Sequence, residues 1–301
     1  MRQLPIQRRV DTLDRVKRLI VNADDFGLTS GVNRAVVELN RHGSLTSATM
    51  MARAAATEES VSIANSNPKL GVGCHVVLLD GIPVTSMDNL PCLTHPRTLR
   101  FAPTLGTFLS RLMLSGRAIE AEIEAEAAAQ IALLQSHGLH LTHIDTHKHS
   151  HMFPRVLRPV LRAARGAGIR TIRNPFEPAW SIRATPRAPW LRRVQVQLLR
   201  TLEPAFRRIV AEEDFVTTDG AIGVLATGTL NVETLASLLR AMPDGTWELV
   251  THPGYNDSDL AQAGTRLLAS REVEQTALAA ASFPSEIELI HFGHLATRNN
   301  T

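Results

Sequence analysis

The segment RLIVNADDFGLTSGVNRAVVELNR, residues 18–41, decides the fold because it joins a buried strand to the helix that follows it. Its apolar run Arg18–Ala23 predicts a parallel strand, and Asp24 and Asp25 stand at the carboxyl end of that strand. Helical spacing over Val32–Arg41 predicts the helix. The segment is therefore one β–α unit of a parallel sheet.

The same alternation of strands and helices continues along the rest of the chain. About seven strands over about 280 residues favour a distorted (β/α) barrel with mostly parallel strands over two domains. We expect one barrel domain over 18–297, an N-terminal extension over 1–17 and an Arg-rich helical insertion at about 176–212. The other expected strands are Leu45–Met51, Gly71–Leu78, Leu141–Asp145, Ile169–Ile172, Phe215–Thr217, Trp247–Thr251 and Glu286–His291. The other expected helices are Ala52–Asn65, Leu105–Ser115, Arg117–His137, Pro154–Arg165, Trp190–Val210, Val232–Ala241 and Glu272–Ala281.

The composition excludes several classes of protein. In 301 residues, 44% are apolar and 20% charged, which is typical of a globular protein and excludes global disorder. No apolar run reaches the ~20 residues that a membrane-spanning helix needs. Cys74 and Cys92 are too few for a disulfide scaffold, and residues 1–17 lack the apolar core of a secretory signal. We therefore expect a cytoplasmic protein.

Positive charge is concentrated in one stretch. The net charge is +3, but residues 155–209 contain 13 Arg and two acids, a local balance of +11 that leaves −8 for the remainder. Aromatic residues make up only 4% and no nucleic-acid-binding motif is present, so a nucleic-acid partner is not expected.

The same stretch contains an amphipathic helix with two interpretations. Its apolar residues could pack on the barrel beneath solvated arginines. Alternatively, they could form an apolar surface that lies on an anionic membrane, a peripheral contact at the inner membrane. The apolar residues are Trp180, Trp190, Leu191, Val194, Leu198 and Leu199, and the flanking cations are Arg192, Arg193 and Arg200.

Polar clusters follow several of the predicted strands. They are Asn22–Asp25, His75, the run His143–His151 and the segment Thr251–Tyr255. Active sites form at the carboxyl ends of strands in parallel α/β folds, so we expect these clusters to meet. The HxHxH run on an extended segment is expected to place Asp145, His147, His149 and His151 on one face.

These residue types point to a metal hydrolase. Adjacent carboxylates at a buried strand end repel one another, and a divalent cation compensates them directly. One of Asp24 and Asp25 with His75 and His147 would make a two-His, one-carboxylate site, which suits catalytic Zn²⁺ and also Fe²⁺. The other Asp would act as a base towards water. Without a metal, the same residues would be a strand-to-helix cap beside structural histidines that form hydrogen bonds. The residues alone leave open which Asp is the ligand.

At these residues the chain resembles the YdjC-like carbohydrate deacetylases, which include enzymes for chitooligosaccharides. The resemblance implies a distorted barrel related to the polysaccharide deacetylases. It also implies N-deacetylation of an acetamido sugar with a divalent metal. The metal could be zinc or magnesium. The matching segments are LIVNADDFGLTSGVNRAV (Leu19–Val36), GVGCHVVL (Gly71–Leu78), LTHIDTHKHSHMFP (Leu141–Pro154) and THPGY (Thr251–Tyr255).

The resemblance also implies residue roles. Asp25, His75 and His147 would bind the metal, Asp24 would be the general base, and His252 the general acid for the leaving amine. Substrate contacts or supporting hydrogen bonds are expected from His149 and His151, and Tyr255 would either line the sugar site or pack. Gly81–Pro103 is a candidate lid, and Cys74 a buried filler.

Within the family, the chain is most similar to the hopanoid-biosynthesis-associated members. The similarity lies in GTLNVETLASLLRAMPDGTWELVTHPGYND (Gly228–Asp257) and in the Arg-rich insertion before it. It implies an N-acetylglucosaminyl hopanoid lipid as substrate.

Two further functions stay open beside a chitooligosaccharide deacetylase. HxH at a strand end also serves metal-dependent phosphoesterases and amidohydrolase-like hydrolases, and the basic stretch would suit a non-catalytic lipid-binding protein.

Overall fold

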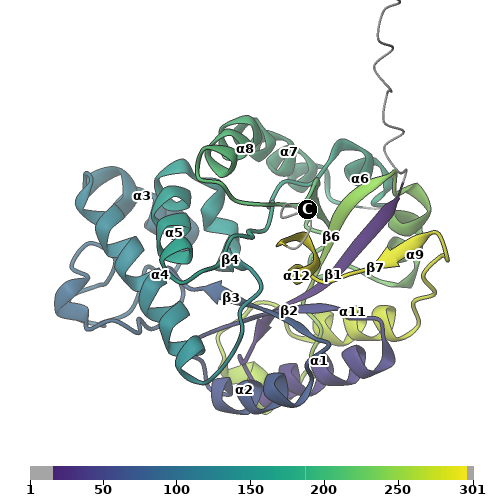
Figure 1. The fold of residues 1–301 in the computed structure, drawn as a ribbon, viewed down its shortest axis with the longest axis horizontal. Coiled ribbons are helices and arrows are strands. Elements are labelled where there is room, and N and C mark those ends of the chain that lie inside the picture. The colour runs from purple at the N-terminus through teal and green to yellow at the C-terminus, as the bar shows by residue number, and fades with distance from the viewer. Residues whose placement is uncertain (1–15, 187, 297–301) are drawn as a thin grey trace, which may run out of the picture.

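The computed structural model describes residues 16–186 and 188–296, so most of the expected extension 1–17 lies outside the described residues. Seven parallel strands form one curled sheet in the order β4-β3-β2-β1-β6-β5, with β7 paired to the amino-terminal part of β1 (Figure 1). The strands are β1 Lys17–Phe26, β2 Ser47–Met50, β3 Gly71–Val76, β4 Ile144–Thr146, β5 Gly220–Ile222, β6 Gly245–Thr251 and β7 Ile287–Leu289.

Short contacts continue the sheet beyond β4. Ile172 forms a single parallel bridge with Ile144, and Thr171 forms another with Val216. The backbone N–H of Ala221, in β5, donates a hydrogen bond of 3.1 Å to the carbonyl of Phe176. The sheet therefore curls into a distorted parallel barrel, which confirms the predicted fold class. The strands expected at 169–172 and 215–217 are reduced to these bridges, and β5 was not predicted.

Helices surround the curled sheet, with α3, α4 and α5 on one side and α9 and α11 on the other (Figure 1). The α-helices are α1 Ser30–His42, α2 Thr57–Ser66, α3 Leu105–Leu114, α4 Ala118–Ser136, α5 Pro154–Gly166, α6 Ala179–Ala184, α7 Trp190–Leu199, α8 Glu203–Glu212, α9 Val232–Ala241, α10 Ser258–Gln262, α11 Ala269–Ala279 and α12 Gly293–Ala296. Short 3₁₀ turns are η1 Met87–Asn89, η2 His147–Met152 and η3 Arg200–Leu202. Among the described residues, no helix combines the length and the apolar character that crossing a membrane requires.

The first β–α unit forms as its sequence predicts. Most of β1 is buried, as expected for a central parallel strand covered on both faces. Thr29 caps α1 by accepting a hydrogen bond from the N–H of Val32, and Gly43 ends the helix in the left-handed conformation with φ 87°. The helix expected from Ala52 begins only at Thr57, because turns occupy the residues between.

The segment 81–103 is fastened to α4. Glu126 accepts hydrogen bonds from the backbone N–H groups of Val84 (2.8 Å) and Thr85 (2.9 Å). Glu122 accepts similar bonds from Cys92 and Leu93, each 2.9 Å from its Oε2. The two acids lie one turn apart on a buried face of α4, and their carboxylates satisfy loop amides that would otherwise lose water. These attachments hold the segment in place and favour a packed loop over a free lid.

A histidine closes the amino-terminal end of the barrel. His143 is buried just before β4, and its ring stacks on Phe292 with centroids 3.9 Å apart. On its other side, an added Cβ on Gly73 of β3 would collide with the imidazole ring. Gly73 is therefore required by close packing rather than by backbone conformation.

We expect Gly73→Ala to lower the free energy of unfolding by roughly 1–3 kcal/mol, because the added methyl must displace His143 in a closely packed interior. Chemical denaturation would measure the change. Gly166→Ala is the matched control, since an added Cβ there meets nothing within 4 Å and α5 tolerates alanine. Equal stability of the two variants would contradict this account of Gly73.

Candidate active site

The candidate active site lies at the carboxyl ends of β1, β3 and β4. Asp25 Oδ1 is 3.6 Å from His75 Nε2 and 3.5 Å from His147 Nδ1, and these two ring nitrogens are 3.2 Å apart. One carboxylate oxygen and two imidazole nitrogens thus converge on a common point. The side chain of His147 is 20% exposed, whereas His75 and Asp25 are nearly covered, so the group opens to solvent on the His147 side.

The remaining polar atoms of this trio are fixed by other residues. His75 Nδ1 contacts Asp145 Oδ1 at 2.7 Å, which orients the ring so that Nε2 points at Asp25. Arg271 Nη2 donates a hydrogen bond of 2.6 Å to Asp25 Oδ2, leaving Oδ1 free to face the histidines. Metal-binding imidazoles and carboxylates in proteins are held by outer partners of this kind. The donor set therefore fits a divalent cation.

The charges of the trio also favour a bound cation. Burial by itself lowers the pKa of His75, but Asp145, Asp24 and Asp25 raise it to about 9. Burial raises the pKa of Asp25, but Arg271 and His147 hold it well below its usual range. The site thus favours one positive charge between the imidazoles and the carboxylates, which a proton or a cation can supply.

Asp24 faces a different partner. Arg173 binds it through both terminal nitrogens, with Nη1 2.8 Å from Oδ2 and Nη2 2.6 Å from Oδ1. Thr49 and Asn22 also donate to Oδ1, at 3.2 and 3.0 Å. Burial raises the pKa of Asp24, but Arg173, together with His75 and His252, holds it far below its usual range. Asp24 is therefore ionised and fixed in one orientation.

Arg173 is buried with three carboxylates around it. Besides Asp24, it contacts Asp145 Oδ2 and places its Nε 2.8 Å from Glu248 Oε1. Burial raises the pKa of Glu248 to about 7, although Arg173 acts in the opposite direction. Glu248 Oε2 has no hydrogen-bond partner among the described residues, which agrees with a protonated carboxyl.

His252 approaches the same group from the loop after β6. Its Nε2 is 3.8 Å from Asp24 Oδ2, and its side chain is 12% exposed. Glu274 on α11 accepts a hydrogen bond of 2.6 Å from the His252 backbone N–H and lies 3.9 Å from Nδ1. The structure therefore brings together all five residues to which the resemblance gives catalytic or metal-binding roles.

The HxHxH run does not form the extended face that the sequence predicted. Residues 147–152 form the 3₁₀ turn η2, with Lys148 and His149 in the left-handed conformation at φ 54° and 52°. His151 is fully buried, and its ring contacts Thr146 Oγ1 at 2.8 Å and the Arg173 carbonyl at 3.2 Å. Both ring nitrogens of His151 are thus engaged, so its position favours a supporting role over a sugar contact.

His149 and Tyr255 also take positions that the sequence left open. The Nδ1 atom of His149 is buried without a partner among the described residues, and burial and Arg173 lower the pKa of His149 to about 3. Tyr255 packs on α1, where its hydroxyl donates to Glu38 at 2.5 Å and Arg34 covers its ring at 3.6 Å. A sugar-binding role for Tyr255 is therefore not supported, whereas its packing alternative is.

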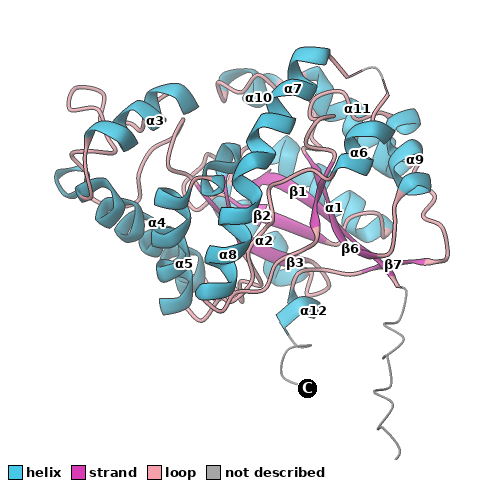
Figure 2. Ribbon diagram, turned by 90° about the horizontal axis from the view of Figure 1, so that it is seen from above, coloured by secondary structure: helices cyan, strands magenta, loops and turns pink. Residues whose placement is uncertain are grey.

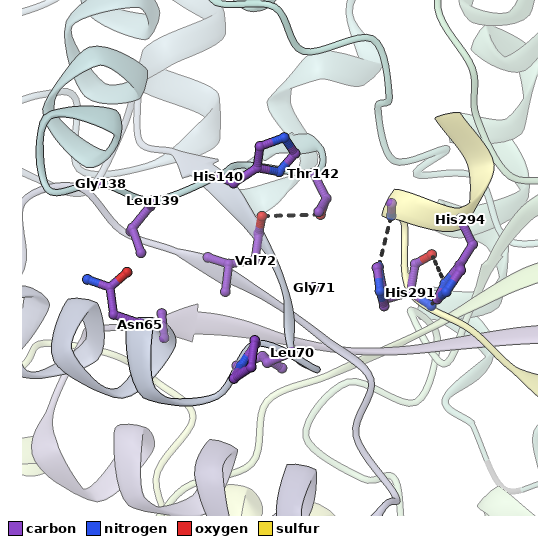
Figure 3. Close-up of a pocket in the computed structure, with 13 residues that line it drawn as sticks. Asn65, Leu70, Gly71, Val72, Gly138, Leu139, His140, Thr142, His291 and His294 are labelled. Carbon is purple, nitrogen blue, oxygen red and sulfur yellow. Dashed lines mark hydrogen bonds between the residues drawn. The ribbon is translucent and has the colours of Figure 1, made fainter. Parts of the chain in front are cut away.

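Figure 3 shows a cavity of about 520 Å³ that is lined by residues at the amino-terminal ends of β3 and β4, away from this site. Leu70, Gly71 and Val72, at the start of β3, line it together with His140 and with His291, which packs against Gly71. It shares no residue with the group around Asp25, so it is separate from the chemistry.

Sequence reasoning missed four residues of the site: Arg173, Glu248, Arg271 and Glu274. Arg173 follows the predicted strand Ile169–Ile172, so the strand-end rule could have found it. Glu248 alternates within β6 with apolar neighbours, which is a weaker signal. Arg271 and Glu274 lie on a helix far along the chain from Asp25, and no local pattern connects them.

Comparison with known proteins places these residues in a family. The profile of the family described as YdjC-like protein matches residues 18–288. A carbohydrate deacetylase of Brevibacillus brevis is 32% identical over 289 residues, covering 92% of this chain and 99% of that protein. A carbohydrate deacetylase of Geobacillus stearothermophilus is 32% identical over 260 residues, covering 86% of this chain and 87% of that protein.

A solved structure supports the fold. The crystal structure of a proposed cellobiose-phosphate cleavage protein from Enterococcus faecalis superposes with a TM-score of 0.73 at 23% identity. The match covers 93% of this chain and 99% of that one. The barrel architecture is therefore shared by an experimentally determined protein.

The buried carboxyl of Glu248 predicts a pH dependence of stability. The folded protein holds this proton up to about pH 7, whereas the unfolded chain releases it near 4.5, so this group's contribution to the unfolding free energy falls as pH rises between those values. Glu248→Gln should remove that decline, which amounts to at most about 3 kcal/mol of unfolding free energy. Denaturation series across this pH range would measure it.

Glu288→Gln, at an exposed carboxylate, is the control and should keep the wild-type profile. Parallel stability curves for the wild type and Glu248→Gln would show that Glu248 is not the group responsible.

Proposed function

The chain belongs to the YdjC-like protein family, and on that premise we propose that it is a metal-dependent deacetylase of N-acetylglucosamine-type sugars. The observation that carries the proposal is the convergence of Asp25, His75 and His147 beside the Asp24–His252 pair. The named relatives are carbohydrate deacetylases, which agrees with hydrolysis of an amide C–N bond.

Asp25 Oδ1, His75 Nε2 and His147 Nδ1 would hold the cation. Bound there, a divalent ion such as zinc or magnesium would polarise the acetyl carbonyl and lower the pKa of water. His75 is kept in the required orientation by Asp145, and Asp25 by Arg271. The trio is exposed on the side of His147, where water and substrate would reach it.

Asp24 would accept the proton of the attacking water at Oδ2. That oxygen accepts one hydrogen bond, from Arg173 at 2.8 Å, and faces His252 at 3.8 Å, whereas Oδ1 takes hydrogen bonds from Arg173, Thr49 and Asn22. The Arg173 contact keeps the carboxylate ionised and stops it from turning towards a cation. The ionised Asp24 is thus held away from the cation and available as a proton acceptor, whereas Asp25 is placed as a ligand, although they are adjacent in sequence.

His252 would donate a proton to the departing nitrogen, because an amine anion is a very poor leaving group. Glu274 accepts the hydrogen bond of the His252 backbone N–H and lies 3.9 Å from Nδ1, so it helps to position the ring. The side chain is partly exposed at the mouth of the barrel, where an incoming acetamido group would arrive.

As the substrate, we favour an N-acetylglucosaminyl hopanoid lipid over a free chitooligosaccharide. The similarity of Gly228–Asp257 to the hopanoid-associated members supports this choice. A lipid-borne sugar would also require the protein to reach a membrane surface from the cytoplasm.

Acetate release from free N-acetylglucosamine, chitobiose and an N-acetylglucosaminyl hopanoid would test the substrate. We expect the highest kcat/KM for the lipid. A preference for chitobiose would redirect the proposal to oligosaccharides, and phosphate release from sugar phosphates without acetate release would overturn it.

Asp24→Asn should keep its bound metal and lose roughly 10²–10⁴-fold in kcat, because the amide preserves shape but accepts no proton. Metal content by elemental analysis and steady-state kinetics would be measured on the same preparation. Turnover close to the wild-type value would contradict the role of Asp24 as base.

His147→Ala is the contrasting variant. It removes one ligand atom from the trio, so metal content and activity should fall together. A His147→Ala protein that keeps stoichiometric metal would show that the ion binds elsewhere.

A further inference from the structure

The helix α7 directs its apolar side to solvent, whereas an ordinary surface helix directs that side to the core. None of its residues is buried, and its exposed apolar residues Trp190, Leu191, Val194 and Leu198 occupy positions i, i+1, i+4 and i+8, which share one helical face. Trp190 is 70% exposed and Leu198 67%. We call these four residues the α7 face.

The arginines of α7 point towards the protein instead. Arg192 donates to the carbonyl oxygens of Thr227 (2.8 Å) and Val224 (3.3 Å). Arg193 donates to the carbonyls of Ile182, at 2.6 Å, and Thr185. Of the two interpretations of this stretch, the one in which apolar residues cover the barrel beneath solvated arginines is therefore wrong for most of this helix. Trp180 and Leu199 do pack on the core.

These arginine contacts fix the orientation of the α7 face. Arginine anchors on the inner side hold the helix in one orientation, so the apolar side cannot roll inward without breaking four hydrogen bonds. Isolated exposed apolar residues need no explanation, but a contiguous helical stripe marks an interaction surface.

The surroundings of the α7 face are positively charged. Arg183 and Arg266 are exposed and Arg200 is 34% exposed, and Arg266 is close enough to Arg192 to lower its pKa further after the effect of burial. Glu203, the acid nearest in sequence, forms ion pairs with Arg207 at 2.9 Å and with Arg200 at 3.9 Å. An apolar stripe with tryptophan at one end and cations beside it complements an anionic lipid surface.

The α7 face lies at the same end of the barrel as the candidate active site. The Thr227 carbonyl bound by Arg192 precedes Gly228, whose N–H donates to Glu274 at 2.9 Å, and Glu274 also holds the backbone of His252. Figure 2 shows α7 and α3 at one edge of the molecule, opposite α12. On α3, Met113 and Leu114 are 81% and 86% exposed and form a second exposed apolar site.

We propose that the α7 face binds the surface of an anionic lipid bilayer, with the mouth of the barrel directed towards it. The use of this contact rests on the proposed function, since a glycolipid must be reached at a membrane. The contact itself is a property of the surface and needs no substrate, so the two proposals can fail separately.

Co-sedimentation of the full-length protein with vesicles tests the proposal. Binding is expected to phosphatidylcholine vesicles that contain phosphatidylglycerol, to be weaker with phosphatidylcholine alone, and to weaken as salt is raised. Val194→Glu and Leu198→Glu should each lower partitioning at least about tenfold, because a carboxylate replaces an inserted apolar group beside anionic lipid.

Val232→Glu is the matched control, since Val232 is 49% exposed on α9 and Val194 is 52% exposed. It should leave vesicle binding unchanged. All three variants should hydrolyse a water-soluble substrate at the wild-type rate, which separates binding from folding and from catalysis.

Absence of binding to phosphatidylglycerol vesicles at low salt would overturn the proposal. Equal loss in Val194→Glu and Val232→Glu would also overturn it, because the effect would then be one of general charge. Concentration-dependent dimerisation that Val194→Glu abolishes, without vesicle binding, would assign the α7 face to a second copy of the chain instead.

Discussion

One buried guanidinium holds the catalytic end of this barrel together. Arg173 contacts carboxylates from three strands, Asp24 of β1, Asp145 of β4 and Glu248 of β6. Buried carboxylates are tolerated only when they are paired or protonated, and removing one member of such a group typically costs about 3–5 kcal/mol. The geometry of Asp24 and, through Asp145, of His75 therefore depends on this cation.

The two adjacent aspartates differ because different arginines hold them. Arg173 takes both oxygens of Asp24, whereas Arg271 takes only Oδ2 of Asp25 and leaves Oδ1 facing two imidazoles. Asp25 also has a positive φ of 63°, which turns its backbone away from the regular course of β1. Residues that would point to opposite faces of a regular strand can therefore serve one site with separate roles.

The two ends of the barrel follow different physical rules. At the amino-terminal end, His143 packs closely between Gly73 and Phe292. At the carboxyl end, charged groups are arranged in pairs, and α11 supports both Asp25 and His252 through Arg271 and Glu274. The α7 face borders this end, so recognition of a surface and chemistry at the mouth share one side of the molecule.

The sequence by itself determined the β–α alternation, the family and the five residues around the candidate metal position. The alternation and the meeting of the polar clusters could be predicted because buried strands are continuous apolar runs and parallel strands bring their carboxyl ends to one edge. The family followed from the resemblance of four motif segments. Only the tertiary structure decided which Asp faces the histidines, because that depends on Arg173 and Arg271, which are distant in sequence. It also decided that residues 147–152 turn rather than extend, and that α7 presents its apolar side outward. Those outcomes depend on left-handed backbone at Lys148 and His149 and on carbonyl oxygens that bind Arg192 and Arg193, and local periodicity carries no information about either.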